Sequence, residues 1–326
     1  MVIQRAETGW QERWARARRF IGPVDATTAT PPLPPPLPEG RVTTVAGRGD
    51  MFFRHAAGPA GGPTVLLLHG WVISADLNWW QVYQPLAERG QVVAPDHRGH
   101  GRGLRTQQPF SLEAAADDAA ALLRHLGVGP AIVCGYSMGG SIALLLWRRH
   151  PELVRGLVLE ATSLDWRERL RERLLWKIMG LVELVSRLGA SEGFAERVLR
   201  DAVEHSPELA PHEAWLKAEL QRGNTRQFAD AGRAMAAFDP SGFAPSIDVP
   251  TAVVVTTGDQ LVPPFKQRAL AAAVPGAVIF SLAGDHRACW LQPRRFEAAT
   301  VAAVEWVQAR TAPPSAALPE AVPLGR

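Results

Sequence analysis

One serine between glycines restricts the fold of this chain more than any other feature. Ser137 lies at the centre of the sequence GYSMG, residues 135–139. The apolar residues 130–133 before it are typical of a buried strand, and residues 141–147 after it are typical of a helix. A serine with glycines two residues away on either side, at a strand-to-helix turn, is the G-x-S-x-G nucleophile elbow. The sequence therefore predicts a strained turn that exposes the Ser137 hydroxyl above the sheet edge.

The flanking glycines and the residue after the serine complete this expected turn. A side chain at position 135 or 139 would clash with neighbouring backbone, so glycine is used at both positions. The amide of Met138, at the N-terminus of the expected helix, would point toward a negative oxygen formed near the serine. The alternative is a glycine-rich turn with a bystander serine, and residues elsewhere in the chain decide between the two.

Short apolar runs alternate with helical patterns along most of the chain. This alternation predicts an α/β fold with a mostly parallel sheet that is covered by helices on both faces. Ligands of such sheets bind beyond the carboxyl ends of the strands. The other expected strands are residues 42–46, 51–55, 64–68, 91–94, 156–160, 250–256 and 277–282. The other expected helices include residues 79–89, 112–126, 263–273 and 294–310.

Two further polar residues follow expected strands at the same edge of the sheet as the serine. Asp259 comes after residues 250–256, and His286 comes after residues 277–282. A serine needs a base within reach, and the base needs an acid to orient it. We expect His286 to take the Ser137 proton and Asp259 to fix the imidazole tautomer. Considered alone, Asp259 fits a structural turn carboxylate as well as it fits a catalytic acid. His286, considered alone, fits a loop histidine as well as it fits a catalytic base.

The loop after residues 64–68 is the expected source of a second oxyanion donor. The Trp71 amide is predicted to act with the Met138 amide, because an oxyanion hole needs two donors. Three other histidines, His69, His97 and His100, are expected to brace loops by hydrogen bonds. No cluster has the ligand spacing of a zinc site, so we assign neither a metal nor a cofactor.

Five motifs together resemble the α/β-hydrolase superfamily. They are HGW at 69–71, DHRGHG at 96–101, GYSMGG at 135–140, GDQLVP at 258–263 and GDH at 284–286. The resemblance implies an eight-stranded sheet with an antiparallel second strand and a cap domain over the site. It favours the serine esterase, lipase and cofactor-free haloperoxidase branches, because dehalogenases and epoxide hydrolases use aspartate where Ser137 stands. Asp285 departs from the pattern, since glycine usually precedes the histidine.

The domain organisation follows from the same patterns. Residues 1–22 are expected to form an amphipathic helix, and residues 23–40 a proline-rich linker. Residues 41–161 and 246–311 would form the α/β-hydrolase core. Residues 162–245 lack strand signals and would form a helical cap inserted after the sixth strand. The tail, residues 312–326, is expected to be disordered.

Composition limits the partners and the location. The net charge is only +3 and no nucleic-acid motif is present, so we expect no nucleic-acid partner. Two cysteines are too few for a disulfide framework, and no apolar run is long enough to span a membrane. The N-terminus lacks the apolar region of a signal peptide, so we expect a cytoplasmic protein. The helix over residues 1–22 would pack on the core, or alternatively would contact an anionic membrane surface, as the cap could also do.

The sequence predicts a serine hydrolase that cleaves a carboxylic ester, or a thioester or lipid ester, through an acyl-enzyme. Trp71, Trp79 and Trp80 are expected near the mouth of the site, which would suit a small-molecule substrate with a hydrophobic acyl or alkyl part. Hydrolysis of a carbon–carbon bond in a dienoic keto acid and peracid formation of the haloperoxidase type are alternatives. A ligand-binding receptor with the same fold is the non-enzyme alternative.

Overall fold

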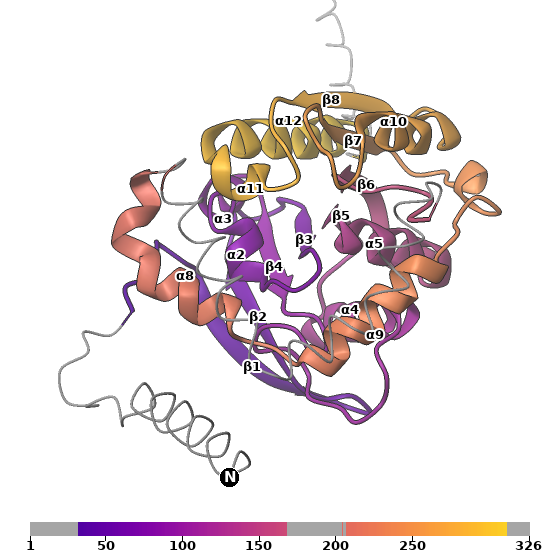
Figure 1. Cartoon of the computed structure of the whole chain (residues 1–326). Helices are drawn as coiled ribbons and strands as arrows, with labels where there is room; N and C mark the ends of the chain where they lie inside the picture. Colours follow the sequence, from indigo (N-terminus) through magenta and orange to yellow (C-terminus); the bar gives the residue numbers. More distant parts are fainter. Residues whose placement is uncertain (1–31, 168–203, 205–206, 312–326) are drawn as a thin grey trace, which may run out of the picture. The chain divides into compact units, whose positions relative to one another are not determined.

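The computed structural model describes residues 32–167, 204 and 207–311, and these residues contain an eight-stranded sheet (Figure 1). Its strands are β1 (Glu39–Val45), β2 (Gly49–Ala56), β3 (Thr64–Leu68), β4 (Gln91–Pro95), β5 (Ala131–Tyr136), β6 (Val154–Glu160), β7 (Thr251–Thr256) and β8 (Val278–Leu282). Their spatial order is β1-β2-β4-β3-β5-β6-β7-β8. Strand β2 is antiparallel to both of its neighbours, and the remaining pairs are parallel. The mostly parallel sheet with an antiparallel second strand is therefore confirmed.

Helices cover both faces of this sheet (Figure 1). The described α-helices are α2 (Ala75–Trp79), α3 (Tyr83–Ala87), α4 (Leu112–Leu126), α5 (Met138–Arg149), α8 (Glu213–Leu220), α9 (Thr225–Ala237), α10 (Pro264–Ala273), α11 (Ala288–Leu291) and α12 (Pro293–Thr311). Short 3₁₀ turns are η1 (Pro151–Leu153), η3 (Pro207–His212) and η4 (Ala244–Ser246). One apolar core lies beneath α4, α5 and α10, and a second lies beneath α3 and α12.

The central strands are apolar on both faces because each face is covered. In β3, Leu66 and Leu68 pack into the first core, whereas Val65 and Leu67 pack into the second. This division follows from the two-residue period of side chains along a strand. Both faces of these central strands are buried against apolar side chains. Polar chemistry is therefore expected at the carboxyl ends of the strands.

The prediction of one helix over residues 79–89 is wrong, because the structure has two short helices there. Helix α2 ends at Trp79, and α3 begins at Tyr83. Pro85 explains the break: it has no amide hydrogen, and its ring would clash with the carbonyl of Gln81 in a continuous helix. Proline is tolerated only in the first turn, which is where α3 places it.

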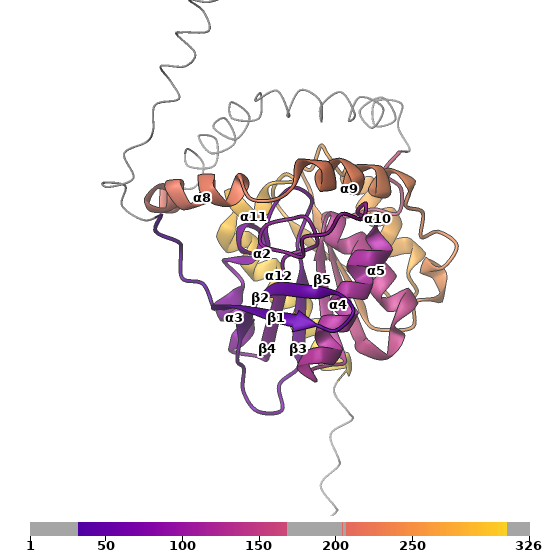
Figure 2. The ribbon, with the colours of Figure 1, turned by 90° about the horizontal axis from the view of Figure 1, so that it is seen from below.

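The chain between β6 and β7 is described only in part. Its described elements are η3, α8, α9 and η4, of which α8 contacts α2 and α9 contacts α4 (Figure 2). Residues 168–203 of the predicted cap lie outside the described residues, so a cap over 162–245 stays a prediction. The predicted helix 1–22, residues 23–31 of the predicted linker and the tail 312–326 also lie outside them, and β1 begins at Glu39. Within the described ranges, no helix has both the length and the apolar character needed to cross a membrane.

The turn at Ser137 joins β5 to α5 in a conformation that residues other than glycine seldom adopt. Ser137 has φ 53° and ψ −116°. Such strain persists only where surrounding contacts hold it. The Ser137 amide donates to the carbonyl oxygen of Glu160 at 2.8 Å, and the Gly140 amide donates to the Ser137 carbonyl oxygen at 2.9 Å. The strained turn expected from the sequence is confirmed.

The glycines beside this turn are required by contact with backbone, as predicted. A Cβ atom on Gly139 would lie 2.0 Å from the Leu68 carbonyl oxygen, at the end of β3. A Cβ atom on Gly135 would lie 2.3 Å from the carbonyl oxygen of Gly139. Real Cβ atoms do not approach backbone this closely, so neither glycine can gain a side chain unless β3, β5 or α5 moves.

Glu160 is a fully buried carboxyl group at the end of β6, next to the turn. Its Oε2 accepts a hydrogen bond from the Thr300 hydroxyl of α12 at 3.0 Å. Burial raises the pKa of Glu160 to about 8, and the hydrogen bond from Thr300 opposes this increase. Glu160 is therefore mostly neutral at pH 7.

We expect Gly139→Ala to reduce the free energy of unfolding by about 3 kcal/mol, because the new methyl group overpacks a backbone contact. Thermal denaturation compared with the wild-type chain measures the loss. Gly242→Ala is the matched control, since a Cβ atom there meets nothing within 4 Å. Equal melting temperatures for the two variants would contradict the steric account of the turn.

The buried Glu160 predicts a pH-dependent stability difference. A carboxyl group whose pKa is raised on folding contributes most stability below its ordinary pKa and loses it as pH rises through about 8. Each pKa unit corresponds to about 1.4 kcal/mol. Glu160→Gln cannot ionise, so its melting temperature relative to wild type should rise between pH 5 and pH 9. The exposed Glu88→Gln should show no such trend, and a flat difference for Glu160→Gln would count against the raised pKa.

Candidate active site

The structure brings together the three side chains that the sequence singled out. The Nε2 atom of His286 lies 3.0 Å from the Ser137 Oγ. Its Nδ1 atom lies 2.8 Å from Asp259 Oδ2. Ser137, Asp259 and His286 come from the carboxyl ends of β5, β7 and β8, which explains how residues 149 and 27 positions apart meet. The geometry is that of a nucleophile, a base and an orienting acid.

Asp259 is fixed in one orientation by its own turn. The amides of Leu261 and Val262 donate to Oδ1 at 2.9 and 2.8 Å, and the Thr256 hydroxyl donates to Oδ2 at 2.9 Å. Asp259 is only 1% exposed. These donors hold the carboxyl group in one orientation and leave Oδ2 directed at His286. A carboxylate held in this way can fix the imidazole tautomer.

The loop that carries His286 is held by residues on either side. The Tyr136 hydroxyl donates to the His286 carbonyl oxygen at 3.0 Å. Asp285 is bound by Arg287, whose amide and guanidinium donate to its carboxylate at 2.8 and 2.7 Å. Asp285 therefore has another partner, and the acid beside the imidazole is Asp259. The departure from glycine at position 285 leaves the geometry of the histidine intact.

The loop after β3 lies against the serine. A Cβ atom added to Gly70 would lie 3.6 Å from the Ser137 Cβ, so this backbone passes close to the serine. The Gly70 amide donates to Asn78 Oδ1 at 2.9 Å, and the next residue, Trp71, precedes a positive-φ Val72. The Gly70 amide is therefore already engaged. The roles of the Trp71 and Met138 amides as oxyanion donors stay predictions.

Asn78 is a residue that sequence reasoning missed. It is fully buried on α2, and its Oδ1 accepts the Gly70 hydrogen bond. Its position eight residues after Gly70 matches no catalytic motif, so no local signal pointed to it. Its effect is to fix the backbone that runs into Trp71.

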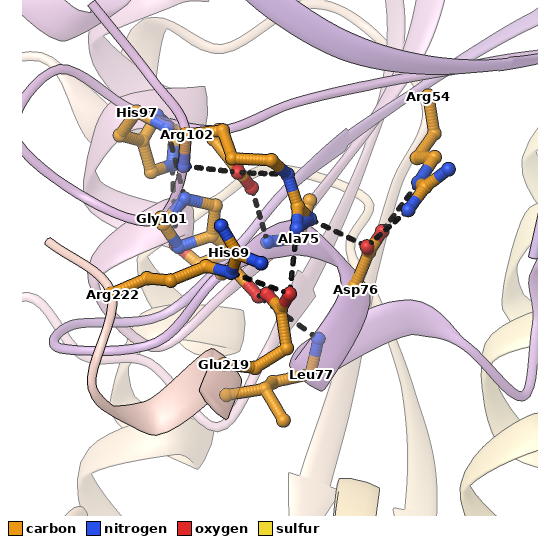
Figure 3. Close-up of polar contacts among 12 residues, drawn as sticks. Arg54, His69, Ala75, Asp76, Leu77, His97, Gly101, Arg102, Glu219 and Arg222 are labelled. Carbon is orange, nitrogen blue, oxygen red and sulfur yellow. Dashed lines mark hydrogen bonds and ion pairs between the residues drawn. The ribbon is translucent and has the colours of Figure 1, made fainter. Parts of the chain in front are cut away.

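The other three histidines brace loops, as expected. The His97 amide donates to His69 Nε2 at 2.9 Å (Figure 3), and His69 Nδ1 lies 2.7 Å from the Gly70 carbonyl oxygen. His100 Nδ1 lies 3.0 Å from the Arg98 carbonyl oxygen. Burial lowers the pKa of His69 to about 4 and that of His100 to about 3, so both are neutral at pH 7. These side chains tie the loop after β3 to the loop after β4.

The placement of tryptophans at the mouth of the site is wrong for Trp79. Trp79 is 0% exposed and lies in the second core, with ring centroids 6.2 Å from Tyr136 and 5.7 Å from Phe296. Trp80 packs against a separate apolar cluster around α8. Trp71 is partly exposed, and its indole nitrogen donates to the Phe228 carbonyl oxygen at 2.8 Å. Sequence position alone could not separate these tryptophans, because the expected helix began at Trp79, whereas Trp79 is the last residue of α2.

Known proteins are similar in sequence to this one over most of the chain. The magnesium-chelatase 30 kDa subunit of Rhodobacter capsulatus is 30% identical over 289 residues, which cover 85% of this chain and 90% of that protein. The pimeloyl-[acyl-carrier protein] methyl ester esterase of Neisseria meningitidis is 31% identical over 211 residues, which cover 61% of this chain and 77% of that protein.

The fold is also found in solved structures, and a family model matches the sequence. The enol-lactonase from Burkholderia xenovorans LB400 superposes with a TM-score of 0.70 at 23% identity, covering 81% of this chain and all of that one, which shows the fold alone. The family model described as alpha/beta hydrolase fold matches residues 63–293. That range contains the sheet from β3 to β8 and every residue of the site. The chain therefore belongs to the α/β-hydrolase fold family, whose fold is an enzyme fold.

Proposed function

We propose that this chain is a serine hydrolase that cleaves carboxylic esters through an acyl-enzyme intermediate. The observation that carries the proposal is the continuous hydrogen-bond chain from Ser137 Oγ through His286 to Asp259, at 3.0 and 2.8 Å. A serine hydroxyl is a weak nucleophile unless a base removes its proton. In this proposal His286 is that base, and Asp259 orients it.

The proposed reaction has two halves. His286 Nε2 takes the Ser137 proton as Oγ attacks the ester carbonyl, and the Trp71 and Met138 amides stabilise the oxyanion. His286 then gives the proton to the leaving alcohol, and the acyl group stays on Ser137. In the second half, His286 takes a proton from water, the hydroxide attacks the acyl carbon, and the acid leaves as Ser137 regains the proton.

The proposed substrate is a small ester with a hydrophobic acyl or alkyl part. The turn and helix after Asp259 expose two large apolar side chains, Leu261 at 55% and Phe265 at 44%. The relative from Neisseria meningitidis is named for a methyl ester. Thioesters and lipid esters use the same chemistry and belong in the same substrate panel. Hydrolysis of a dienoic keto acid and peracid formation are alternatives that the same three residues would support.

A second candidate is a non-catalytic role as a binding protein. The observation that favours it is the relative named as a subunit of magnesium chelatase, which matches over 90% of its length. On this account the site around Ser137 would bind a ligand as a receptor does, and the serine would not turn it over. The complete set of nucleophile, base and acid favours the hydrolase.

The cytoplasmic location and the membrane contact also stay proposals. Cys134 and Cys289 are both unpaired and buried, in keeping with a reducing compartment. The amphipathic pattern of residues 1–22 would bind anionic vesicles at low salt, and that binding would weaken as salt is added.

We expect Ser137→Ala to reduce ester turnover by about 10⁴-fold or more, because it removes the nucleophile. Asp259→Asn should cost up to about 10⁴-fold through the wrong imidazole tautomer. The measurement is kcat and KM on short- and long-chain nitrophenyl esters and thioesters. Ser281→Ala, an exposed serine on β8, is the matched control. If the wild-type chain turns over no ester or thioester faster than Ser137→Ala does, the ester hydrolase proposal fails.

A further inference from the structure

Helix α8 packs directly on the loop that follows β3 and on α2. A small apolar cluster fills this contact, separate from the two cores: Ile73, Leu77, Leu209, Trp215, Leu216 and Leu291. Trp215 and Leu216 come from α8, whereas Ile73 belongs to the loop after β3 and Leu77 to α2. The contact thus joins the chain inserted between β6 and β7 to the segment that carries Trp71.

The polar half of the same contact is a cluster of buried charges (Figure 3). Asp76 on α2, Asp96 after β4 and Glu219 on α8 have side chains no more than 1% exposed. Arg102 reaches all three, with nitrogen–oxygen distances of 2.5, 3.6 and 2.6 Å respectively. Arg54 donates twice to Asp76, at 2.9 and 2.7 Å. Arg102 therefore links α8 to α2 and to the loop after β4.

The charges balance separately on the two sides of this contact. The core side holds two arginines and two carboxylates: Arg54, Arg102, Asp76 and Asp96. On the other side, Arg222 lies 2.8 Å from Glu219, and the Arg222 side chain is 44% exposed. Loss of the Glu219 charge therefore leaves the buried core side neutral, and water can solvate Arg222. The large destabilisation that follows when a buried charge loses its partner is not expected here.

Glu219 also holds the first turn of α2. Ser74 is the N-cap of α2, and its Oγ accepts a hydrogen bond from the Leu77 amide at 3.3 Å. The same hydroxyl donates to Glu219 Oε2 at 2.8 Å, across 145 residues of sequence. The Ala75 amide donates to Asp96 Oδ1 at 2.7 Å. The end of the loop after β3 is thus fixed by carboxylates from two other segments.

The start of this loop is held by α2 and by the chain that follows α8. Asn78 on α2 accepts the Gly70 hydrogen bond, and the Trp71 indole donates to the Phe228 carbonyl oxygen on α9. The Asn224 amide, just before α9, donates to the Gly99 carbonyl oxygen at 2.8 Å. Residues 219–228 therefore contact both the loop after β3 and the loop after β4.

We propose that Glu219 is a positioning residue, which fixes the loop after β3 and, through it, the Trp71 amide in the geometry that stabilises the oxyanion. The inference rests on the proposed function, because it assigns Glu219 a part in ester hydrolysis. Glu219 acts through Ser74 and α2 rather than on the substrate. The packing of α8 against α2 is thereby coupled to the rate of the chemical step.

The test compares Glu219→Ala with Glu213→Ala, an identical change on the exposed face of the same helix. Removing an oxyanion donor costs about 10²–10³ in rate, so a donor left in place but poorly fixed should cost about 10-fold in kcat. KM should change by less than about twofold, since substrate binding is not altered. Hydrogen exchange measured by mass spectrometry should be faster over residues 70–79 in Glu219→Ala, and unchanged in Glu213→Ala.

A double-mutant cycle with Ser74→Ala identifies the route. If Glu219 acts through Ser74, the double variant should lose no more kcat than the larger of the two single losses. If the kcat losses of the two single variants multiply in the double variant, the two residues act independently and the route through Ser74 is overturned. Glu219→Gln keeps the size and an acceptor oxygen, so it should recover part of the lost kcat while remaining folded. Should Glu219→Ala not fold, the proposal is judged on Glu219→Gln, which must then show faster exchange over residues 70–79 than wild type.

Hydrogen exchange separates failure of this inference from failure of the proposed function. Exchange over residues 70–79 that is the same in wild type and both Glu219 variants would overturn the inference, even in an active esterase. Absence of Ser137-dependent turnover in wild type would overturn the proposed function, whereas the exchange comparison would still show whether Glu219 holds the loop.

Discussion

Direct contact between the backbones of β3 and α5 is the constraint on which the site depends. Gly139 lies so close to the Leu68 carbonyl oxygen that no side chain fits between them. This contact, with the hydrogen bond from the Ser137 amide to Glu160, holds Ser137 at positive φ. The serine hydroxyl is then presented at the carboxyl ends of the central strands, next to the loop after β3. Strain in one residue is maintained by close packing of three neighbouring strands and one helix.

The parallel sheet brings the remaining chemistry to the same edge. Strands β7 and β8 end side by side, so Asp259 and His286 meet although 27 residues separate them. Each is fixed by local hydrogen bonds, Asp259 by two amides of its own turn and the His286 loop by the Tyr136 hydroxyl. Because these bonds exist before substrate arrives, little reorganisation is needed for proton transfer. This preorganisation is the physical basis of the proposed hydrolase.

The parts of the structure that depend on short-range pattern could be predicted from the sequence. The glycines around Ser137, the strand ends before Asp259 and His286, and the two-faced apolar strands are local features with one physical explanation each. The burial of Trp79 could not be predicted, because the expected helix began at Trp79, whereas Trp79 is the last residue of α2 and packs into the second core. Glu219 could not be found either, since its partners Ser74 and Arg102 are more than 100 residues away and form no motif.

The most direct measurement is covalent labelling by a fluorophosphonate, which reacts with a serine only when that serine is activated. Peptide mapping by mass spectrometry would locate the adduct in the wild-type chain and in His286→Ala. The account predicts one adduct on Ser137 in the wild-type chain and a labelling rate reduced by about 10³-fold or more without the imidazole. An unlabelled Ser137, or equal labelling of both proteins, would contradict the claim that His286 activates this serine.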